Sequence, residues 1–162
     1  MPFEDIIVDT NVFMHADNEK EMRCAASRKF VESLLKCKAL LCVDTGFSTV
    51  ESENRSYIGQ EYLTKLIFGG IGYSAVATLA MTQRVKFVEK KIDAQVSRKI
   101  NQLVTDKTDR IFVRVAVNST DSTVVSHDFQ AFSDAARANL RKKISVTVLA
   151  ADECEPTEPS KS

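Results

Sequence analysis

The sequence predicts an α/β domain with a parallel sheet of about five strands and helices on both faces. Short apolar runs rich in β-branched residues, such as Ile6-Ile7-Val8, alternate along the chain with longer amphipathic segments. This alternation is typical of parallel sheets, because each parallel connection needs a crossover that is usually a helix. The runs are continuously apolar, as expected of strands that are covered on both faces. A length of 162 residues suffices for one such domain.

The first half of the chain predicts two strands, each followed by helices. The run 6–8 is too short for a buried helix and ends on Asp9, which indicates a strand. From about residue 18 apolar positions recur every three or four residues, as on one face of a helix. Thr45 is interpreted as a helix N-cap. The elements expected here are a strand at 6–8, a helix at about 18–35, a strand at 39–43, a helix from Thr45 and a helix at 57–68.

The second half continues the alternation and ends in a polar tail. A loose alternation at 85–92 favours a strand, and polar capping residues before Ile111 mark a fresh helix start. The compact run from Thr123 is a strand signal. The expected elements are a strand at 85–92, helices at 93–104 and 105–118, a strand at 123–126, a helix at 129–140 and a strand at 145–149. The domain is therefore placed at 1–150, and 151–162 is expected to be a disordered acidic tail.

Composition excludes several classes of protein. The 22 basic and 22 acidic residues balance. The last twelve residues contain four acids and one lysine, so residues 1–150 carry a net charge of +3. No apolar run reaches the length of a membrane span, and the amino end lacks the basic stretch of a signal peptide, so we expect a cytoplasmic protein without a membrane partner. The four cysteines form no CxxC pair, which indicates reduced thiols rather than a zinc site.

Four acidic residues are expected to meet at one edge of the sheet. Asp9 and Asp128 end two of the predicted strands, and ligands of open parallel sheets bind at the carboxyl ends of strands. Glu51 lies about two turns into the helix expected after the second strand, and Asp109 begins the helix before the fourth. Clustered carboxylates repel one another unless cations neutralise them, and hard oxygen ligands suit Mg²⁺ or Mn²⁺. Such ions activate water for attack on a phosphodiester, which predicts a metal-dependent nuclease.

Each of these assignments has a competitor. Glu53 lies two residues from Glu51 and points elsewhere, so only one of them faces the site, and the spacing from Thr45 favours Glu51. Asp106 precedes Asp109 by three residues on the same helix face, and either is also a favourable first-turn acid. Asp128 is preferred over Asp121, His15 and His127 are interpreted as structural or solvent-facing, and Thr10 and Asn11 either contact the metal-bound water and substrate or cap the next helix.

Four segments, "IIVDTNVF", "TGFSTVESE", "DRIFVRVA" and "VVSHDFQAF", resemble the PIN-domain family of ribonucleases in order and spacing over about residues 5–150. The resemblance implies the sheet order 3-2-1-4-5, Mg²⁺ or Mn²⁺ bound by Asp9, Glu51, Asp109 and Asp128, and cleavage of single-stranded RNA to 5′-phosphate ends. Asn11 and Ser126 match polar positions of the family's site. Many bacterial relatives are toxins held inactive by an antitoxin, so an antitoxin is an implied partner, and a homodimer is a further assembly to consider.

The main alternative function is a PIN-like binding or scaffold module with weak catalysis. A phosphotransferase of the haloacid dehalogenase type would need a second aspartate where the chain has Asn11, and a dinucleotide-binding enzyme would need a GxGxxG after the first strand. An RNA substrate also needs basic residues that contact phosphates. Candidates directly after the last predicted helix are Arg141, Lys142 and Lys143.

Overall fold

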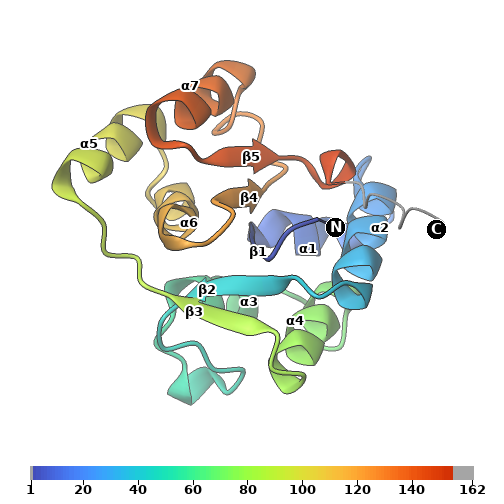
Figure 1. Ribbon diagram of the computed structural model, residues 1–162. Helices are drawn as coiled ribbons and strands as arrows, with labels where there is room; N and C mark the ends of the chain where they lie inside the picture. The colour runs from blue at the N-terminus through green and yellow to red at the C-terminus, as the bar shows by residue number, and fades with distance from the viewer. Residues whose placement is uncertain (1, 155–162) are drawn as a thin grey trace, which may run out of the picture.

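The computed structural model describes residues 2–154 and has a five-stranded parallel sheet at its centre, in the order β3-β2-β1-β4-β5. In Figure 1 the strands follow this order from β3 at the bottom to β5 at the top. The predicted three-layer architecture and strand order are confirmed. The strands are β1 (Asp5–Val8), β2 (Leu40–Asp44), β3 (Val85–Val88), β4 (Thr123–Val125) and β5 (Thr147–Leu149).

The helices form groups around this sheet. α1, α2 and α4 pack on one another, whereas α5 packs on α6 and α7, and α6 lies against β1, β2 and β4. Figure 1 shows the second group separated from α2 and α4. No helix within residues 2–154 is long and apolar enough to cross a membrane. The helices are α1 (Thr10–Ala16), α2 (Cys24–Lys36), η1 (Glu51–Glu53), α3 (Tyr57–Lys65), α4 (Ile71–Met81), α5 (Ala94–Leu103), α6 (Lys107–Asn118), α7 (Asp134–Ile144) and η2 (Ala151–Glu153).

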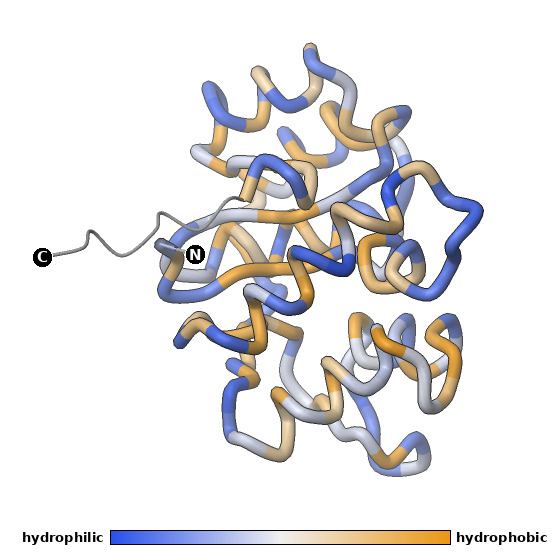
Figure 2. Tube along the Cα trace, turned by 90° about the vertical axis from the view of Figure 1, so that its right-hand side faces the viewer, coloured by the Kyte–Doolittle hydropathy of each residue, from blue (hydrophilic) through white to orange (hydrophobic). Residues whose placement is uncertain are grey.

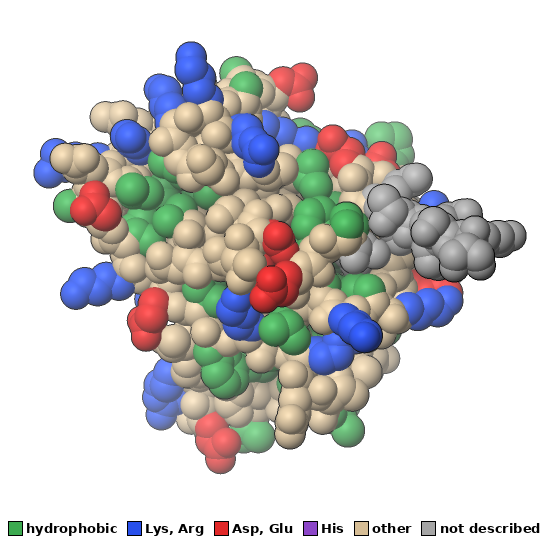
Figure 3. Space-filling view, in the orientation of Figure 1, with side chains coloured by type: hydrophobic (Ala, Val, Ile, Leu, Met, Phe, Trp, Pro, Cys, Tyr) green, Lys and Arg blue, Asp and Glu red, His purple; other side chains and the backbone are tan. Residues whose placement is uncertain are grey.

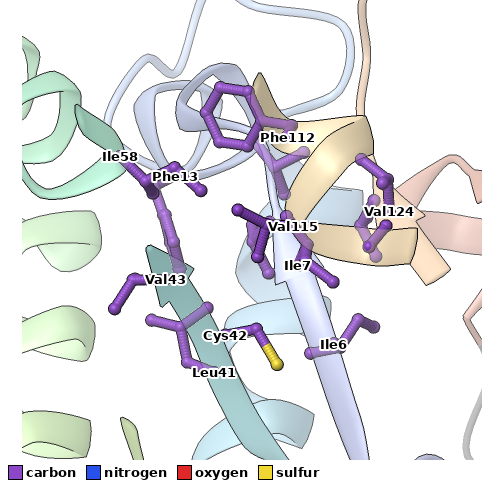
Figure 4. Packing of buried hydrophobic residues seen from close by; sticks show 14 of the residues in the cluster. Ile6, Ile7, Phe13, Leu41, Cys42, Val43, Ile58, Phe112, Val115 and Val124 are labelled. Atoms are coloured by element: carbon purple, nitrogen blue, oxygen red, sulfur yellow. The ribbon is translucent and has the colours of Figure 1, made fainter. Parts of the chain in front are cut away.

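The central strand β1 is buried along its whole length. Ile6, Ile7 and Val8 are fully inaccessible to solvent, as expected for a parallel strand with helices on both faces. Figure 4 shows Ile7 beside Val115 of α6, and Figure 2 shows hydrophobic residues concentrated along the strands while hydrophilic ones gather in the outer loops. The core therefore fixes the position of the residue that follows β1, which is Asp9.

The order of the strands predicts a ligand site at the carboxyl ends of β1 and β4. β1 pairs with β2 on one side and with β4 on the other, with Ile7 opposite Val124 and Val8 opposite Val125. The chain builds outward from β1 to β3 and then crosses back to β4, so the topology switches direction between these two strands. In parallel sheets the carboxyl edge at such a switch point is the usual binding crevice.

The helix expected from Thr45 is not formed, and a buried carboxylate explains why. Asp44 ends β2 with only 1% of its surface exposed, and its oxygens accept hydrogen bonds from Ser56 Oγ (2.6 Å), Tyr57 N (2.7 Å) and Ile58 N (2.8 Å). These bonds place the start of a helix at Tyr57 instead. Residues 45–55 form a loop that contains only the short 3-10 helix η1.

Other predicted boundaries also need correction: α2 begins at Cys24 and not at about residue 18, and β3 ends at Val88 and not at residue 92. The helix expected at 129–140 begins at Asp134, because Ser133 caps it by accepting a hydrogen bond from Ala136 N (3.2 Å). The predicted start of the disordered acidic tail, residue 151, is too early, because Ala151 and Cys154 are buried and η2 packs on α2. The rest of that predicted tail, 155–162, lies outside the described residues.

Candidate active site

Carboxylates from four parts of the chain line one cavity of about 230 Å³. Asp9 follows β1, Asp128 lies shortly after β4, Asp109 is in the first turn of α6, and Glu61 is in the middle of α3. The first three meet where the sequence predicted, at the carboxyl edge of the sheet. The lining residues are Asp9, Thr10, Asn11, Met14, Glu61, Lys65, Asp106, Thr108, Asp109 and Asp128.

Asp9 is held in place by two polar side chains. Its Oδ2 accepts a hydrogen bond from Ser126 Oγ at 2.7 Å and a longer one from Asn11 Nδ2 at 3.3 Å. Asn11 Oδ1 in turn accepts from the backbone N–H of His127 at 3.1 Å, which ties α1 to the segment after β4. Ser126 and Asn11 therefore orient the carboxylate of Asp9, a residue that is 7% exposed.

The remaining aspartates are positioned by turns and a helix cap. Asp128 Oδ1 accepts from the backbone N–H groups of Gln130 (3.2 Å) and Ala131 (3.0 Å). Asp106 is the N-cap of α6 and accepts from Thr108 N (2.8 Å) and Asp109 N (3.2 Å). The competition between Asp106 and Asp109 thus ends with both lining the cavity, Asp106 as the cap and Asp109 one turn further on.

Burial and mutual repulsion raise the pKa of two of these carboxyl groups. Desolvation is the larger cause for Asp9, whose pKa rises to about 6, with a smaller contribution from the charges of Asp128 and Glu61. Desolvation also dominates for Asp109, whose pKa rises to about 7, and the charges of Asp9, Asp128 and Asp106 add to it. The cavity therefore concentrates negative charge that the chain itself does not fully neutralise.

Glu51 is not brought to this cavity. It lies exposed in η1, and it is absent from the lining residues because the loop at 45–55 replaces the helix on which it was placed. Glu53 is exposed in the same turn. The glutamate that lines the cavity is Glu61, which sequence reasoning missed. The signal that could have found it is Ser56, whose side chain caps α3 by accepting from Gly59 N (2.9 Å), with Glu61 five residues further on.

A lysine stands among the acids and was also missed. Lys65 follows Glu61 by one helical turn, and its Nζ lies 2.6 Å from Glu61 Oε2 in an i,i+4 ion pair. This hydrogen bond is the main cause of the raised pKa of Lys65. Lys65 is the only lysine or arginine among the residues lining the cavity.

The basic residues predicted to bind RNA lie elsewhere. α7 ends at Ile144, directly before β5 begins, so Arg141, Lys142 and Lys143 lie toward the amino edge of the sheet, whereas the acids line its carboxyl edge. Arg141 is engaged with Thr147 Oγ1 at 2.5 Å. Figure 3 shows basic side chains gathered at the upper left, over α5 and α7. The structure therefore does not bring this basic run to the candidate site.

The two histidines form a pair. His127 is 7% exposed, which agrees with the structural alternative of the expectation and not with the solvent-facing one. Its Nδ1 lies 2.9 Å from Nδ1 of His15, with ring centroids 5.1 Å apart and planes 14° apart. A nitrogen contact this short, with that centroid separation and nearly parallel planes, means that the rings meet edge to edge. His127 Nε2 also accepts from Ala151 N at 3.1 Å, so the pair connects α1, the segment after β4 and η2.

The acid cavity is the middle of a longer trough. A hollow of about 630 Å³ on one side shares Asp106, Asp109 and Asp128 with it. A hollow of about 430 Å³ on the other side shares Met14 and Lys65. Consecutive hollows with shared walls suit an extended ligand that passes over the carboxylates.

No known protein family, curated protein or solved structure matches this chain. The chemistry of the site therefore has to be inferred from its own side chains.

The oxygen ligands, the excess negative charge and one unsatisfied hydroxyl fit a divalent cation. Thr10 Oγ1 is buried without a hydrogen-bond partner in the described chain, and Thr10 lines the cavity. Within residues 2–154, however, no three aspartate, glutamate, histidine or cysteine side chains are arranged to hold a metal ion as they stand. A cation would have to draw the carboxylates together.

Proposed function

We propose that the chain is a Mg²⁺- or Mn²⁺-dependent endoribonuclease that cleaves single-stranded RNA. The observation that carries the proposal is the cluster of Asp9, Asp109, Asp128 and Glu61 in the middle of the trough. A strand laid along such a trough would pass its phosphodiester backbone over the carboxylates. The choice of RNA rests on the resemblance to PIN-domain ribonucleases.

Each cavity residue has a distinct task in this proposal. Asp9, Asp109, Asp128 and Glu61 would hold the cation, which would supply positive charge that stabilises the transition state of phosphodiester hydrolysis and would lower the pKa of the attacking water. Ser126 and Asn11 keep the Asp9 carboxylate oriented through their hydrogen bonds. Thr10 Oγ1 has a hydroxyl proton to donate to a phosphate oxygen or a water.

Lys65 has a second role to offer. Because the ammonium group is bound to Glu61 and half exposed, it can turn to a phosphate oxygen when Glu61 moves to the cation. The cavity would then lose an internal ion pair and gain contacts to both the cation and the substrate. Lys65 thus replaces the distant residues Arg141, Lys142 and Lys143 as the phosphate-binding residue nearest the acids.

The decisive experiment compares two glutamates. Purified protein is assayed on an unstructured RNA and on a paired stem of equal length, with Mn²⁺ or with excess EDTA. We expect cleavage of the unpaired RNA only, with loss of activity in EDTA and in Asp9→Asn. Glu61→Gln should weaken Mn²⁺ binding measured by calorimetry by about tenfold or more, whereas the matched exposed variant Glu51→Gln should bind like the wild type.

One observation favours a second candidate, a binding or scaffold module with weak catalysis. The carboxylates are not arranged for a metal as they stand, and Lys65 already neutralises Glu61. In that case Mn²⁺ would bind no more tightly to the wild type than to Asp9→Asn, and RNA would bind without being cut. A cognate antitoxin remains a prediction of the resemblance, which co-purification from the native source would test.

A further inference from the structure

The hollow that shares Met14 and Lys65 with the acid cavity is a candidate for a separate binding site. Its volume of about 430 Å³ lies within the range of small-molecule sites. It is formed by the end of α1, the segment before α2 and the segment after α3, and it meets the acid cavity at Met14 and Lys65. The lining residues are Met14, His15, Asp17, Asn18, Glu21, Lys65 and Ile67.

Most charged groups of this hollow are already engaged. Asp17 accepts from the backbone N–H groups of Ile71 (2.7 Å) and Gly72 (3.2 Å) at the start of α4. Lys65 is bound to Glu61 at 2.6 Å. The bonds of Asp17 hold the walls together, and the ammonium group of Lys65 is directed to Glu61.

Glu21 and Asn18 keep free hydrogen-bonding capacity. The half-buried carboxylate of Glu21 has no hydrogen bond or ion pair to another residue within 2–154. Asn18 Oδ1 accepts from Lys20 N at 3.2 Å, which leaves the two protons of its amide nitrogen without a partner among the described residues. The hollow therefore offers a carboxylate acceptor and an amide donor.

The charge of the walls decides the class of ligand. Two carboxylates face one lysine that is already paired, so a phosphate would be repelled, whereas a neutral group rich in N–H donors would be attracted. Two apolar side chains, Met14 and Ile67, are 41% and 65% exposed and offer surfaces on which a flat ring can lie. A neutral heteroaromatic ring with donors along its edge satisfies both conditions.

We propose that this hollow binds a guanine base of the RNA strand whose backbone crosses the acid cavity. Guanine carries two adjacent donors, N1–H and the 2-amino group, which a carboxylate such as Glu21 can accept together, and its O6 can accept from the Asn18 amide. Met14 and Ile67 cover the ring faces. The inference rests on the proposed ribonuclease function for the rest of the strand, and it makes cleavage selective for a position near a guanine.

The test uses nucleosides, because they need neither the metal nor cleavage. Guanosine, inosine, adenosine, cytidine and uridine are titrated into the full chain in EDTA, and binding is followed by NMR shifts of the Met14 and Ile67 methyl groups. We expect guanosine to bind at least tenfold more tightly than the other four. Inosine, which lacks the 2-amino group, reports on the second hydrogen bond to Glu21.

Matched variants separate recognition from folding. Glu21→Gln should weaken guanosine binding about tenfold and remove the preference over inosine, whereas Glu19→Gln, an exposed acid on the same segment paired with Arg28 at 3.7 Å, should not. Ile67→Ser should weaken binding of guanosine, whereas Phe68→Ser, which changes an exposed side chain outside the hollow, should leave it unchanged. In Glu21→Gln the sites of RNA cleavage should lose their guanine bias.

The outcomes distinguish this inference from the nuclease proposal. Cleavage of RNA without guanosine binding or base bias would overturn the guanine site and leave the nuclease standing. Guanosine binding without RNA cleavage would support the site while the nuclease proposal fails. A further titration with N-acetylarginine amide tests whether the hollow binds a basic protein segment instead. Tighter binding of this arginine derivative than of guanosine would overturn the proposal.

Discussion

Replacing Asp109 by asparagine should stabilise the metal-free protein at neutral pH. Asp109 as a residue is 7% exposed, and the described residues provide its carboxyl group with no side-chain hydrogen bond. Its pKa rises from 3.8 to about 7, first through desolvation and then through the neighbouring acids. An asparagine at this position would occupy the same space without a charge, so the substitution removes the repulsion and most of the desolvation cost.

The magnitude follows from the size of the pKa shift. Each pKa unit corresponds to about 1.4 kcal/mol, so the shift sets a ceiling of about 4 kcal/mol. Solvent in the open cavity screens part of the repulsion, so we expect a gain of about 2 kcal/mol at pH 8. Below pH 4 the carboxyl group is protonated in both the folded and the unfolded state, and the gain should vanish. Because only the folded state keeps this proton between pH 4 and 7, the wild type loses stability relative to Asp109→Asn as the pH rises through that window.

The assay is urea denaturation in EDTA, followed by circular dichroism at half-unit steps from pH 4 to pH 8. Glu51→Gln is the control, because it removes an exposed carboxylate outside the cavity and should not change the free energy of unfolding at any pH. A difference between Asp109→Asn and wild type that is independent of pH would refute the electrostatic reasoning. So would an Asp109→Asn protein that is less stable at pH 8.

Three further outcomes are expected. Desolvation lowers the pKa of His127 to about 4, so His127→Gln should reduce the loss of stability that the wild type suffers as the pH falls from about 6.5 to 4, measured by the same urea titrations. A chain ending at residue 150 should melt several degrees below one ending at residue 154 in calorimetry, because it lacks the buried side chains of Ala151 and Cys154, and equal melting temperatures would contradict the packing. Asp44→Ala should cost about 2 kcal/mol or more of unfolding free energy, because it leaves the first N–H groups of α3 without their acceptor, whereas Glu51→Ala in the adjoining loop should cost almost nothing.

Strand positions and the acids that follow them could be predicted because both depend on local pattern. The apolar run before Asp9 allows only a buried strand, and parallel topology then places Asp9 beside the segment after β4, where Asp128 lies. Asp109 could be predicted for the same reason, since a capped helix that runs back to β4 begins at the carboxyl edge of the sheet. The sheet order was taken from the resemblance and is confirmed.

Glu51 could not be resolved from spacing, because the start of the helix depends on a contact across the loop. Thr45 is a good N-cap residue by type, but the buried carboxylate of Asp44 binds the N–H groups of Tyr57 and Ile58, 13 and 14 residues further on. Helix α3 therefore begins late, and it presents Glu61 and Lys65 in place of Glu51. The histidine pair was equally out of reach, since it joins residues 112 positions apart in the sequence.

The contact between His15 and His127 has a directional consequence. Because His127 Nε2 accepts the proton of the Ala151 N–H, its own ring proton must reside on Nδ1, and Nδ1 of His15 must then be the acceptor. The two donors in this series of hydrogen bonds, Ala151 N–H and His127 Nδ1–H, therefore both point from η2 toward α1. Neither ring can take up another proton while both bonds persist. Since His127 also donates its backbone N–H to Asn11, the last described segment of the chain and the side chain that orients Asp9 are joined through a bridge that exists in a single protonation state.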